Sequence, residues 1–393
     1  MARKTFDEVV LFARTGLNPR DNFKLGNGNN KYITIKNIHN NEIIIDENTD
    51  VVDDEAIELI HKRSQIKKGD ILFCSIGRMG DMYIIPDEPS GWDINESVFA
   101  FTVDTSLVRQ KYFYYVFKNR DTIEYLIKNS SGSTFKSIKM NQLKKMVFDL
   151  PSLEDQDAIV SALDRLSYII QMRERELANM DNLIKARFVE FFGDPDLNPM
   201  GWKESLLSEK LDVLGGYAFK SDEFDEESGI PVLRIGNINA GYFRPVNMVY
   251  WHEDESLERY AMYPGDLVMS LTGTVGKDDY GNVCILGNDY DKYYLNQRNA
   301  KLEIKEGLNK LYLSEILKFE KIKKRLTGIS RGVRQANIAN RDILNLCIPV
   351  PPMDKQKQFA DFVEQVDKSK VAVQKALDEA QILFDSLMQK YFG

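Results

Sequence analysis

The chain has 393 residues, 43% of them hydrophobic and 28% charged, a composition typical of a globular protein with two or three cores. Its net charge of −8 argues against a protein that coats nucleic acid without regard to sequence. No apolar run approaches the ~18 residues of a membrane-spanning helix, and the opening MARKTFDEVV lacks a signal-peptide core, so we expect a cytoplasmic protein without membrane contact.

The cysteines and histidines give no sign of a metal or redox centre. Cys74, Cys284 and Cys347 lie far apart, as expected of small buried side chains in a reducing compartment. The three histidines do not have the spacing of metal ligands. A zinc site or a histidine-based catalytic centre is therefore not expected.

Two segments of the first half return in the second half. Lys31–Ile38, KYITIKNI, aligns with Pro231–Ile238, PVLRIGNI, and both predict a strand that runs into a turn. Gly69–Asp81, GDILFCSIGRMGD, aligns with Gly265–Lys277, GDLVMSLTGTVGK, where a Gly-Asp turn leads into a strand and then a Gly-x-x-Gly loop. Such a loop can bring backbone N–H groups close to a phosphate; a plain turn is the other interpretation of either copy alone.

A helical stretch follows in each half. Lys111–Gly132 aligns with Leu311–Gly332, and each helix ends on a glycine. The aromatic run Tyr112–Phe117 is predicted to be core rather than a stacking platform, since its spacing suits one helix face against a sheet. A polar loop comes next, Ser131–Lys139 in the first copy and Ser330–Arg341 in the second.

These helices and loops are locally basic. Residues 109–145 contain nine lysines and arginines against two carboxylates, and residues 309–345 contain nine against three. One such run is usually a solvated helix face. Two runs at equivalent places on an acidic chain indicate a surface that faces an anion.

A last strand, Met146–Pro151 or Leu346–Pro352, is expected to lead into a long helix at 151–193 or 351–393. Apolar residues in both helices alternate at spacings of four and three, the a/d seam of a coiled coil. Neither stripe can be buried alone, so we interpret the helices, each about 57 Å long, as partners. The predicted seam consists of Ile159, Leu163, Leu166, Ile170, Leu177, Met180 and Ile184, and of Phe359, Val363, Val366, Val373, Leu377, Phe384 and Leu387.

Gly193, Pro195, Pro199 and Gly201 interrupt the chain after the first long helix and form a connector. Each globule is expected to be mixed α/β with short strands, and equivalent antiparallel helices would relate the globules by a pseudo-two-fold axis. The predicted domains are a first globule (1–150), a long helix (151–193), a connector with a second globule (194–350), and a second long helix (351–393).

Motifs for catalysis are missing from the sequence. We find no Asp/Asn-Pro-Pro-aromatic motif for methyl transfer to an amino group, no Gly-x-Gly-x-x-Gly that opens a βα unit, and no Gly-x-x-x-x-Gly-Lys-Ser/Thr for nucleotide hydrolysis. Asp and Glu residues are scattered without a spacing that selects a nuclease site. The sequence is that of a binding protein.

The chain closely resembles the specificity subunits of Type I restriction–modification systems. The resemblance is carried by LPSLEDQ (Leu150–Gln156), VPPMDKQ (Val350–Gln356) and FVEFFGDPDLNPMGW (Phe188–Trp202). It extends to RIGNI (Arg234–Ile238) and GDLVMSLTGTVGK (Gly265–Lys277), and the order globule–helix–globule–helix covers the whole chain.

The resemblance implies two target recognition domains, each of which reads one half of a bipartite site in double-stranded DNA. It also implies an antiparallel coiled coil that sets the spacing and docks two methyltransferase subunits. In that family the partners carry S-adenosylmethionine and methylate adenine N6, while separate restriction subunits use ATP and Mg to move and cut DNA. The specificity subunit itself is then no enzyme and holds no cofactor or metal.

Candidate DNA-contacting residues follow from the loops and basic patches, with cations on phosphates and polar side chains on base edges. Gly77–Asp81 differs from Gly273–Lys277, so specific contacts cannot be transferred from one half to the other. The candidates are Lys31, Lys36, Gly77, Arg78, Gly80, Ser131, Ser133, Thr134, Lys136 and Lys139 in the first half, and Arg234, Thr272, Gly273, Thr274, Gly276, Lys277, Arg331, Arg334, Gln335 and Asn337 in the second.

Two other interpretations remain open at this point. A stand-alone pseudo-dimeric DNA-binding regulator would share the globules and the helices but have no methyltransferase partner. A self-contained nuclease or methyltransferase is disfavoured by the missing motifs.

Overall fold

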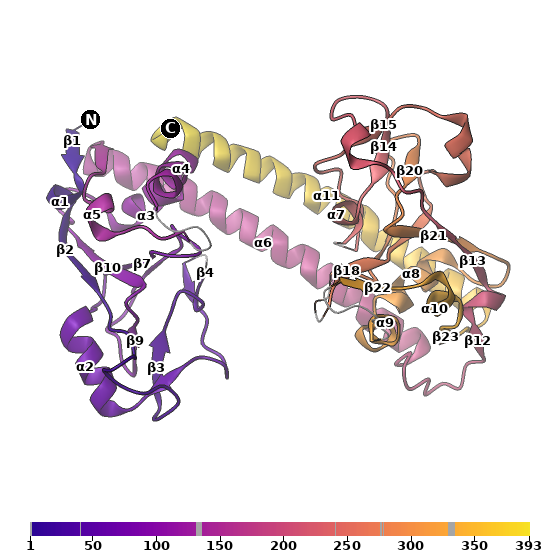
Figure 1. Ribbon diagram of the computed structural model, residues 1–393, viewed down its shortest axis with the longest axis horizontal. Coiled ribbons are helices and arrows are strands. Elements are labelled where there is room, and N and C mark those ends of the chain that lie inside the picture. Colours follow the sequence, from indigo (N-terminus) through magenta and orange to yellow (C-terminus); the bar gives the residue numbers. More distant parts are fainter. Residues whose placement is uncertain are drawn as a thin grey trace. The chain divides into compact units, whose positions relative to one another are not determined.

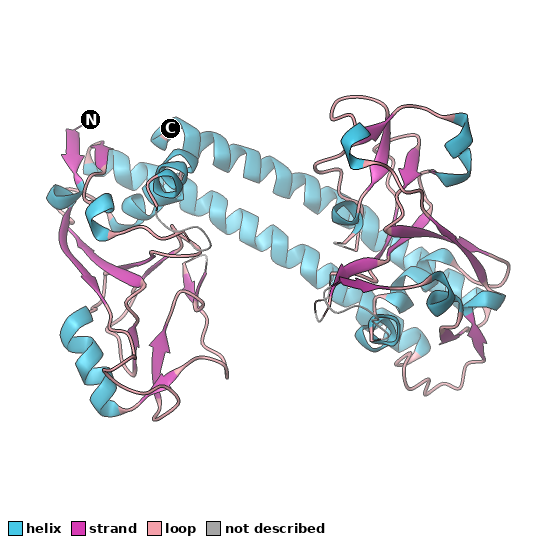
Figure 2. Ribbon diagram, in the orientation of Figure 1, coloured by secondary structure: helices cyan, strands magenta, loops and turns pink. Residues whose placement is uncertain are grey.

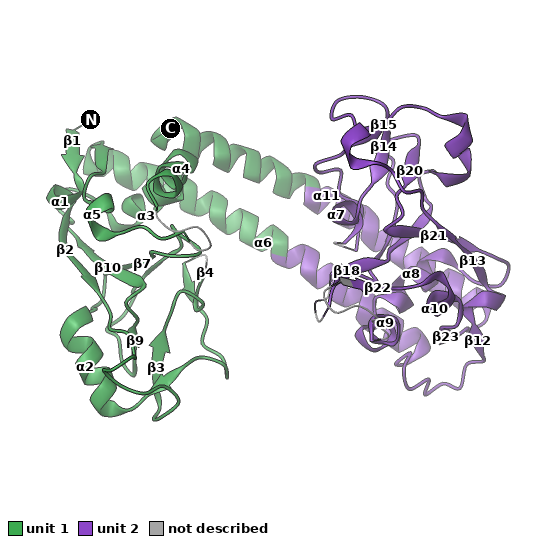
Figure 3. Ribbon diagram, in the orientation of Figure 1, with its two compact units in different colours: residues 1–174, 375–393 green, residues 175–374 purple. Residues whose placement is uncertain are grey.

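The computed structural model describes residues 2–39, 41–130, 136–239, 241–275, 277, 279–328 and 335–393. Helices and strands are mixed along the chain, so the predicted α/β class is confirmed (Figure 2). The chain divides into two compact units (Figure 3). Unit 1 contains Met1–Glu174 and Lys375–Gly393, and unit 2 contains Arg175–Gln374.

The strands of unit 1 are β1 Ala2–Thr5, β2 Val10–Thr15, β3 Asn30–Ile33, β4 Ile38–His39, β5 Glu42–Ile43, β6 Val51–Val52, β7 Ile71–Cys74, β8 Met82–Ile84, β9 Trp92–Ile94, β10 Val98–Val103 and β11 Val147–Leu150. An antiparallel sheet of order β2-β10-β7-β8 forms the centre (Figure 1). A second sheet, β6-β3-β9, shares an apolar cluster with it. The pairs β1-β11 and β4-β5 complete the strands.

The short helices of unit 1 are α1 Phe6–Val9, α2 Asp54–Ser64, α3 Gln110–Lys118, α4 Arg120–Lys128 and α5 Met140–Leu143. Helix α3 buries Tyr112, Phe113, Tyr115 and Phe117. The ring of Phe113 packs against Phe101 of β10. The prediction that this aromatic run belongs to the core is therefore confirmed.

Unit 2 repeats this plan. Its strands are β12 Glu204–Leu206, β13 Leu211–Gly215, β14 Ile230–Leu233, β15 Tyr250–Trp251, β16 Ala261–Met262, β17 Leu267–Ser270, β18 Thr272–Thr274, β19 Val283–Ile285, β20 Tyr293–Leu295, β21 Asn299–Ile304, β22 Gln335–Asn337 and β23 Cys347–Pro349. Its short helices are α7 Ile235–Ile238, α8 Lys310–Leu317, α9 Glu320–Thr327 and α10 Asn340–Leu344. The sheet β13-β21-β17-β19 corresponds to the central sheet of unit 1, β15-β14-β20-β16 to the second sheet, and β12-β23 to the pair β1-β11.

Each predicted helical stretch after the central sheet is two helices, not one. The break falls at Asn119 in unit 1 and at Phe319 in unit 2, where the backbone is extended. Asn119 donates a hydrogen bond to the carbonyl of Phe392 (2.7 Å), and the ring of Phe319 packs on Phe188 (4.9 Å). The break therefore fixes each helix pair to the end of a long helix.

The long helices are α6 Leu153–Phe192 and α11 Met353–Phe392. Each begins in one unit and ends in the other. In unit 2, Asp181 of α6 bonds to Lys370 of α11 (2.6 Å), while Phe188 packs on Phe359. Because positions later in α6 meet positions earlier in α11, the helices run antiparallel there.

The predicted seam residues lie on the inner side of these helices. In unit 1, Ile159 and Leu163 share a core cluster with Phe384 and Leu387. In unit 2, Ile184 shares a cluster with Phe359 and other residues of α11. The remaining seam residues are buried or half-buried: Leu166, Ile170, Leu177, Met180, Val363, Val366, Val373 and Leu377.

Gln156 and Gln356 hold the start of each long helix to the short helix before it. Gln156 Oε1 accepts from the Arg109 N–H (2.8 Å), and Gln356 Oε1 accepts from the Asn309 N–H (2.7 Å). Each amide nitrogen donates to the carbonyl of the proline that precedes the helix. Both glutamines are completely buried, so this contact is a shared part of the scaffold.

The described residues contain no helix with the length and apolarity needed to cross a membrane. Within the same ranges no cluster of histidine, cysteine and carboxylate side chains suits a metal ion. Cys74 and Cys284 are buried and Cys347 is half-buried. The expectation of small buried thiols therefore holds for the first two.

Candidate nucleic-acid interface

In unit 1 the Gly-x-x-Gly loop lies against the polar segment after α4. Gly77 and Gly80 have positive φ angles of 69° and 89°, which glycine adopts at little cost. The Gly77 N–H donates to the Lys136 carbonyl (3.3 Å). A bridge between Ile76 and Ser137 continues the contact. Two predicted groups of DNA-contacting residues, separated in the sequence by β8–β10 and the helices α3 and α4, are thus brought together.

The turn after β3 forms the third side of this region. Asn37 is buried, accepts from the Thr34 N–H (2.9 Å) and donates to the Ile44 carbonyl (3.1 Å), which fixes the turn. Lys36 is exposed beside it, and its carbonyl lies 3.0 Å from His39 Nε2. The Arg78 guanidinium contacts the His39 ring, with Nη1 2.6 Å from Nε2. We call Lys36, His39, Arg78 and Lys136 the unit 1 edge.

In unit 2 the corresponding segments form a regular two-stranded sheet. Strand β18 pairs with β22, and Thr272 lies opposite Asn337. The sequence predicted a loop from Gly273, yet Gly273 is a strand residue, and that part of the prediction is wrong. A Cβ at Gly273 would collide with Asp279 and Tyr280, so the glycine permits a close approach rather than a positive φ.

A chain of hydrogen bonds supports β18. Asp279 Oδ1 accepts from the Thr274 N–H (2.8 Å), which holds the pKa of that carboxyl below its usual value. Asn239 Nδ2 donates to the Asp279 carbonyl (2.6 Å). On its other side Asn282 Oδ1 accepts from Lys323 Nζ (2.6 Å), and Asn282 Nδ2 lies 3.5 Å from Asn239 Oδ1. We call Thr274, Lys277, Asn337 and the supporting Asn239 and Asp279 the unit 2 edge.

The other predicted residues are distributed around these edges. Lys139 precedes α5 and is exposed. Lys31 lies at the start of β3, paired with Val51 and Trp92 and outside the unit 1 edge. Arg234 donates to the Asn247 carbonyl beside the turn held by Asn237. Ser131, Ser133, Thr134, Gly276, Arg331, Arg334 and the side chain of Gln335 lie outside the described residues.

Several cations of the basic runs have structural partners. Arg109 pairs with Asp157, and Lys111 pairs with Asp164, so both face the start of α6. In unit 2, Arg325 pairs with Asp196 of the connector (2.6 Å), and this donation lowers the pKa of Asp196. Net charge along the sequence therefore overstates the charge that remains for an external anion.

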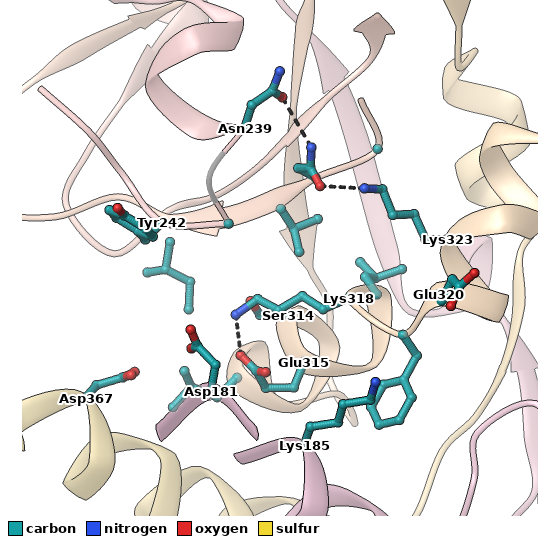
Figure 4. Close-up of a pocket in the computed structure, with 18 of the residues that line it drawn as sticks. Asp181, Lys185, Asn239, Tyr242, Ser314, Glu315, Lys318, Glu320, Lys323 and Asp367 are labelled. Atoms are coloured by element: carbon teal, nitrogen blue, oxygen red, sulfur yellow. Dashed lines mark hydrogen bonds and ion pairs between the residues drawn. The ribbon is translucent and has the colours of Figure 1, made fainter. Parts of the chain in front are cut away.

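A cavity of about 550 Å³ lies in unit 2 between α6, α8, α9 and α11 (Figure 4). Its charges are of both signs: Lys318 bonds to Glu315 (2.6 Å), and the pair of Lys370 and Asp181 also lines it. Lys323, which donates to Asn282 behind the unit 2 edge, also lines the cavity. Because cations and carboxylates pair inside it, the cavity does not select a polyanion.

A family model described as "Type I restriction modification DNA specificity domain" matches residues 3–180 and, a second time, residues 199–381. The two matches cover most of the chain. The chain belongs to this family. The duplication seen in the fold is thus a duplication of one specificity domain.

Members of this family with curated names are distant relatives. The specificity subunit of the Type I restriction enzyme MjaVIII of Methanocaldococcus jannaschii is 25% identical over 274 residues, which cover 65% of this chain and 63% of that protein. The EcoBI specificity subunit of Escherichia coli is 26% identical over 179 residues, 44% of this chain and 35% of that protein. The matched part spans less than two thirds of the length of either relative.

Two solved structures share the fold of this chain. The Type-I restriction-modification system S subunit from M. genitalium aligns over 100% of this chain and 96% of its own, with a TM-score of 0.59 and 15% identity. A chain from a study of complex assembly and conformational transition of the type I R-M system aligns over 100% and 97%, with a TM-score of 0.50 and 17% identity. Identities this low establish the fold alone.

Sequence reasoning missed three supporting residues of the edges, His39, Asn239 and Asp279. His39 and Asn239 occupy the same position of the duplicated segment, 200 residues apart, just after the turn asparagines Asn37 and Asn237. That shared position was the available signal. Nothing in the sequence indicates that Asp279 folds back onto Thr274.

Proposed function

We propose that this chain is the DNA-reading subunit of a Type I restriction–modification complex, in which each unit recognises one half of a bipartite site. The observation that carries the proposal is the duplicated edge. In both units the Gly-x-x-Gly segment meets the polar segment before α5 or α10, beside a turn held by a buried asparagine. Exposed polar and cationic side chains on such an edge can contact base edges and phosphates of duplex DNA.

The long helices are proposed to act as a coiled coil that docks two methyltransferase subunits. Support comes from large apolar side chains that remain exposed on them. In unit 1, Tyr168 and Ile382 are 63% and 69% exposed; in unit 2, Val371 is 70% exposed. Apolar side chains that neither helix pairing nor the globules cover are suited to a protein partner.

Catalysis is assigned to the partners in this proposal. The methyltransferase subunits would supply S-adenosylmethionine, and a restriction subunit would supply ATP and Mg, while this chain contributes only recognition. A stand-alone regulator has no support from the family to which the chain belongs. The same assignment makes the chain alone inactive toward DNA.

The test is methylation in a host that lacks the system. Expressed with the methyltransferase subunit of its own locus, the chain should direct methylation to one bipartite motif, read by sequencing the modified bases. The chain alone and the methyltransferase alone are the controls and should leave DNA unmodified. Methylation by the chain alone, or a contiguous motif, would contradict the proposal.

The spacing role has its own test. One heptad inserted into α6 and one into α11 at facing positions keeps the seam and adds about 10 Å, since each residue rises 1.5 Å. Along duplex DNA this corresponds to about three base pairs at 3.4 Å per pair. The half-site sequences should stay the same while the spacer between them changes. An unchanged spacer at full activity would show that the helices do not set it.

A further inference from the structure

The two edges differ most at the residue that follows the first glycine of the Gly-x-x-Gly segment. This residue is Arg78 in unit 1 and Thr274 in unit 2. Both are exposed. Arg78 presents a guanidinium, whereas Thr274 is the end of a strand whose N–H is already bound to Asp279. The two units therefore offer different chemistry at one position of a shared scaffold.

Arg78 contacts a histidine ring rather than a carboxylate. Its guanidinium contacts the His39 ring, and within the described ranges no Asp or Glu makes an ion pair with it. The nearest acid in sequence, Asp81, is instead paired with Lys118 (3.2 Å). Arg78 therefore keeps its full charge and most of its donors for an external acceptor.

His39 lies between the Lys36 backbone and the Arg78 guanidinium. Its Nε2 is 3.0 Å from the Lys36 carbonyl, and Arg78 Nη1 contacts both ring nitrogens. The carbonyl orients the imidazole, and the imidazole orients the guanidinium. One N–H of Arg78 is used in this way, which leaves Nη2 and Nε as a fork.

We propose that Arg78 reads a guanine in the half-site of unit 1 and that His39 is its positioning residue. A guanidinium fork matches O6 and N7 of guanine in the major groove, the commonest specific arginine contact. This inference rests on the proposed function, since it names the base class that one edge recognises. Unit 2 lacks both groups at the equivalent positions, where it has Thr274 and Asn239.

Arg78 could instead contact a phosphate, and the substitution Arg78→Lys distinguishes this role from guanine recognition. Lysine keeps the charge that a phosphate needs but loses the fork. In the complex with the methyltransferase, Arg78→Lys should lower the methylation rate of the wild-type site about 10- to 100-fold and relax one base of one half-site. The proposal that Arg78 reads a base would be wrong if Arg78→Lys methylated the same motif at a near-normal rate while Arg78→Ala methylated all sequences more slowly to the same degree.

The guanine itself can be tested with modified DNA. Replacing it by 7-deazaguanine removes the N7 acceptor and leaves base pairing intact. The wild-type complex should lose about tenfold in rate on this DNA, whereas Arg78→Ala, which has already lost the contact, should show no further loss. If the modified DNA lowered the methylation rate equally for wild type and Arg78→Ala, Arg78 would not contact that base.

His39 requires a readout that a purely structural role would not change. His39→Leu should relax the same base as Arg78→Ala, while His39→Asn keeps an acceptor near the Nδ1 position and should restore the motif. Thermal unfolding of each variant controls for folding. If His39→Asn and His39→Leu have the same motif, His39 does not position Arg78.

Asn337→Ala in unit 2 is the matched control. It should alter only the other half-site, which assigns each half to its unit. If no bipartite motif is methylated by the wild-type complex, the proposed function fails. If the motif is bipartite but neither Arg78 nor His39 variants change it, only this inference fails.

Discussion

Positions 78 and 274 carry different side chains on a scaffold that the two units share. Arg78 is a long cation that contacts a histidine ring, and Thr274 is a short strand residue whose N–H donates to Asp279. Beneath them the turn asparagines, Asn37 and Asn237, make the same backbone bonds. Under the proposed function, a duplicated domain would change its DNA target at a few exposed positions while its buried polar contacts stay the same.

A second difference lies where each globule meets the long helices. In unit 1, Tyr115 packs on Phe384 of α11 and donates to Asp164 of α6 (2.8 Å), which joins α3 to both long helices. In unit 2 the equivalent residue is Glu315, which bonds to Lys318 and lines the cavity. The equivalent position thus has an aromatic ring in unit 1 and a carboxylate that lines the cavity in unit 2.

The largest difference in stability between the two units is expected at the C-terminal ends of the long helices. Phe188 is completely buried among Phe192, Tyr312, Phe319 and Phe359, and the equivalent position of unit 1 is Met388. Phe188→Ala should cost about 3–5 kcal/mol of unfolding free energy because it leaves a cavity in this cluster. Hydrogen exchange measured by mass spectrometry should locate the loss in unit 2.

Met388→Ala is the matched change in unit 1. It should cost about 2–3 kcal/mol, since the methionine side chain is smaller and adapts more readily. The increased exchange should then appear in unit 1. Identical exchange patterns for the two variants would show that the units do not unfold separately.

The proposed binding of two methyltransferase subunits can be tested at two equivalent leucines of the long helices. Leu183 and Leu383 occupy equivalent positions on α6 and α11, and each is 50% exposed. Leu383→Asp should weaken the binding of one methyltransferase subunit by about 2 kcal/mol or more, because it places a charge in an apolar contact. Native mass spectrometry should then detect a one-to-one complex, and the double variant with Leu183→Asp should bind neither. Normal two-to-one assembly of the double variant would exclude this helix face as the docking surface.

The buried glutamines should behave alike in the two units. Gln156→Leu and Gln356→Leu each leave the backbone N–H of Arg109 or Asn309 without its acceptor, at a cost of about 1–3 kcal/mol. Urea unfolding of both variants measures the cost. Values that differ between the two by more than about 1 kcal/mol would show that the scaffold is less symmetric than its hydrogen bonds indicate.

The smallest expected effect is a pH dependence of the stability of unit 2. Asp196 has a lowered pKa because Arg325 donates to it, so its stabilising contribution is present above its unfolded pKa of about 3.9 and is lost as pH falls through the lower folded value. Asp196→Asn should be slightly less stable than wild type at pH 7. The difference between them should shrink below about pH 4. A difference that is constant from pH 7 to pH 3 would mean that the ion pair makes no pH-dependent contribution.

The repeats made much of the fold predictable. Aligned segments placed the strands β3, β7, β14 and β17, and four-and-three spacing placed the long helices, because both signals come from buried apolar periodicity. The breaks at Asn119 and Phe319 were not predictable, since they depend on contacts with residues distant in sequence. Local spacing carries no information about such partners.

The candidate site was predictable only in part. Glycines and polar loops indicated the Gly77 and Thr272–Lys277 segments, and the structure joins each to the polar segment that follows α4 or α9. It does not place Lys31 there. His39 was missed although it shares a repeat position with Asn239, because its contacts with the carbonyl of Lys36 and with Arg78 depend on residues that the histidine itself does not indicate.

Whether the two units read separate half-sites can be decided by sequencing the methylated motifs for one variant of each unit. Arg78→Ala should change one half of a bipartite motif and Asn337→Ala the other, with the spacer constant in both. If either variant altered both halves, or if the two variants altered the same half, the units would not read separate half-sites.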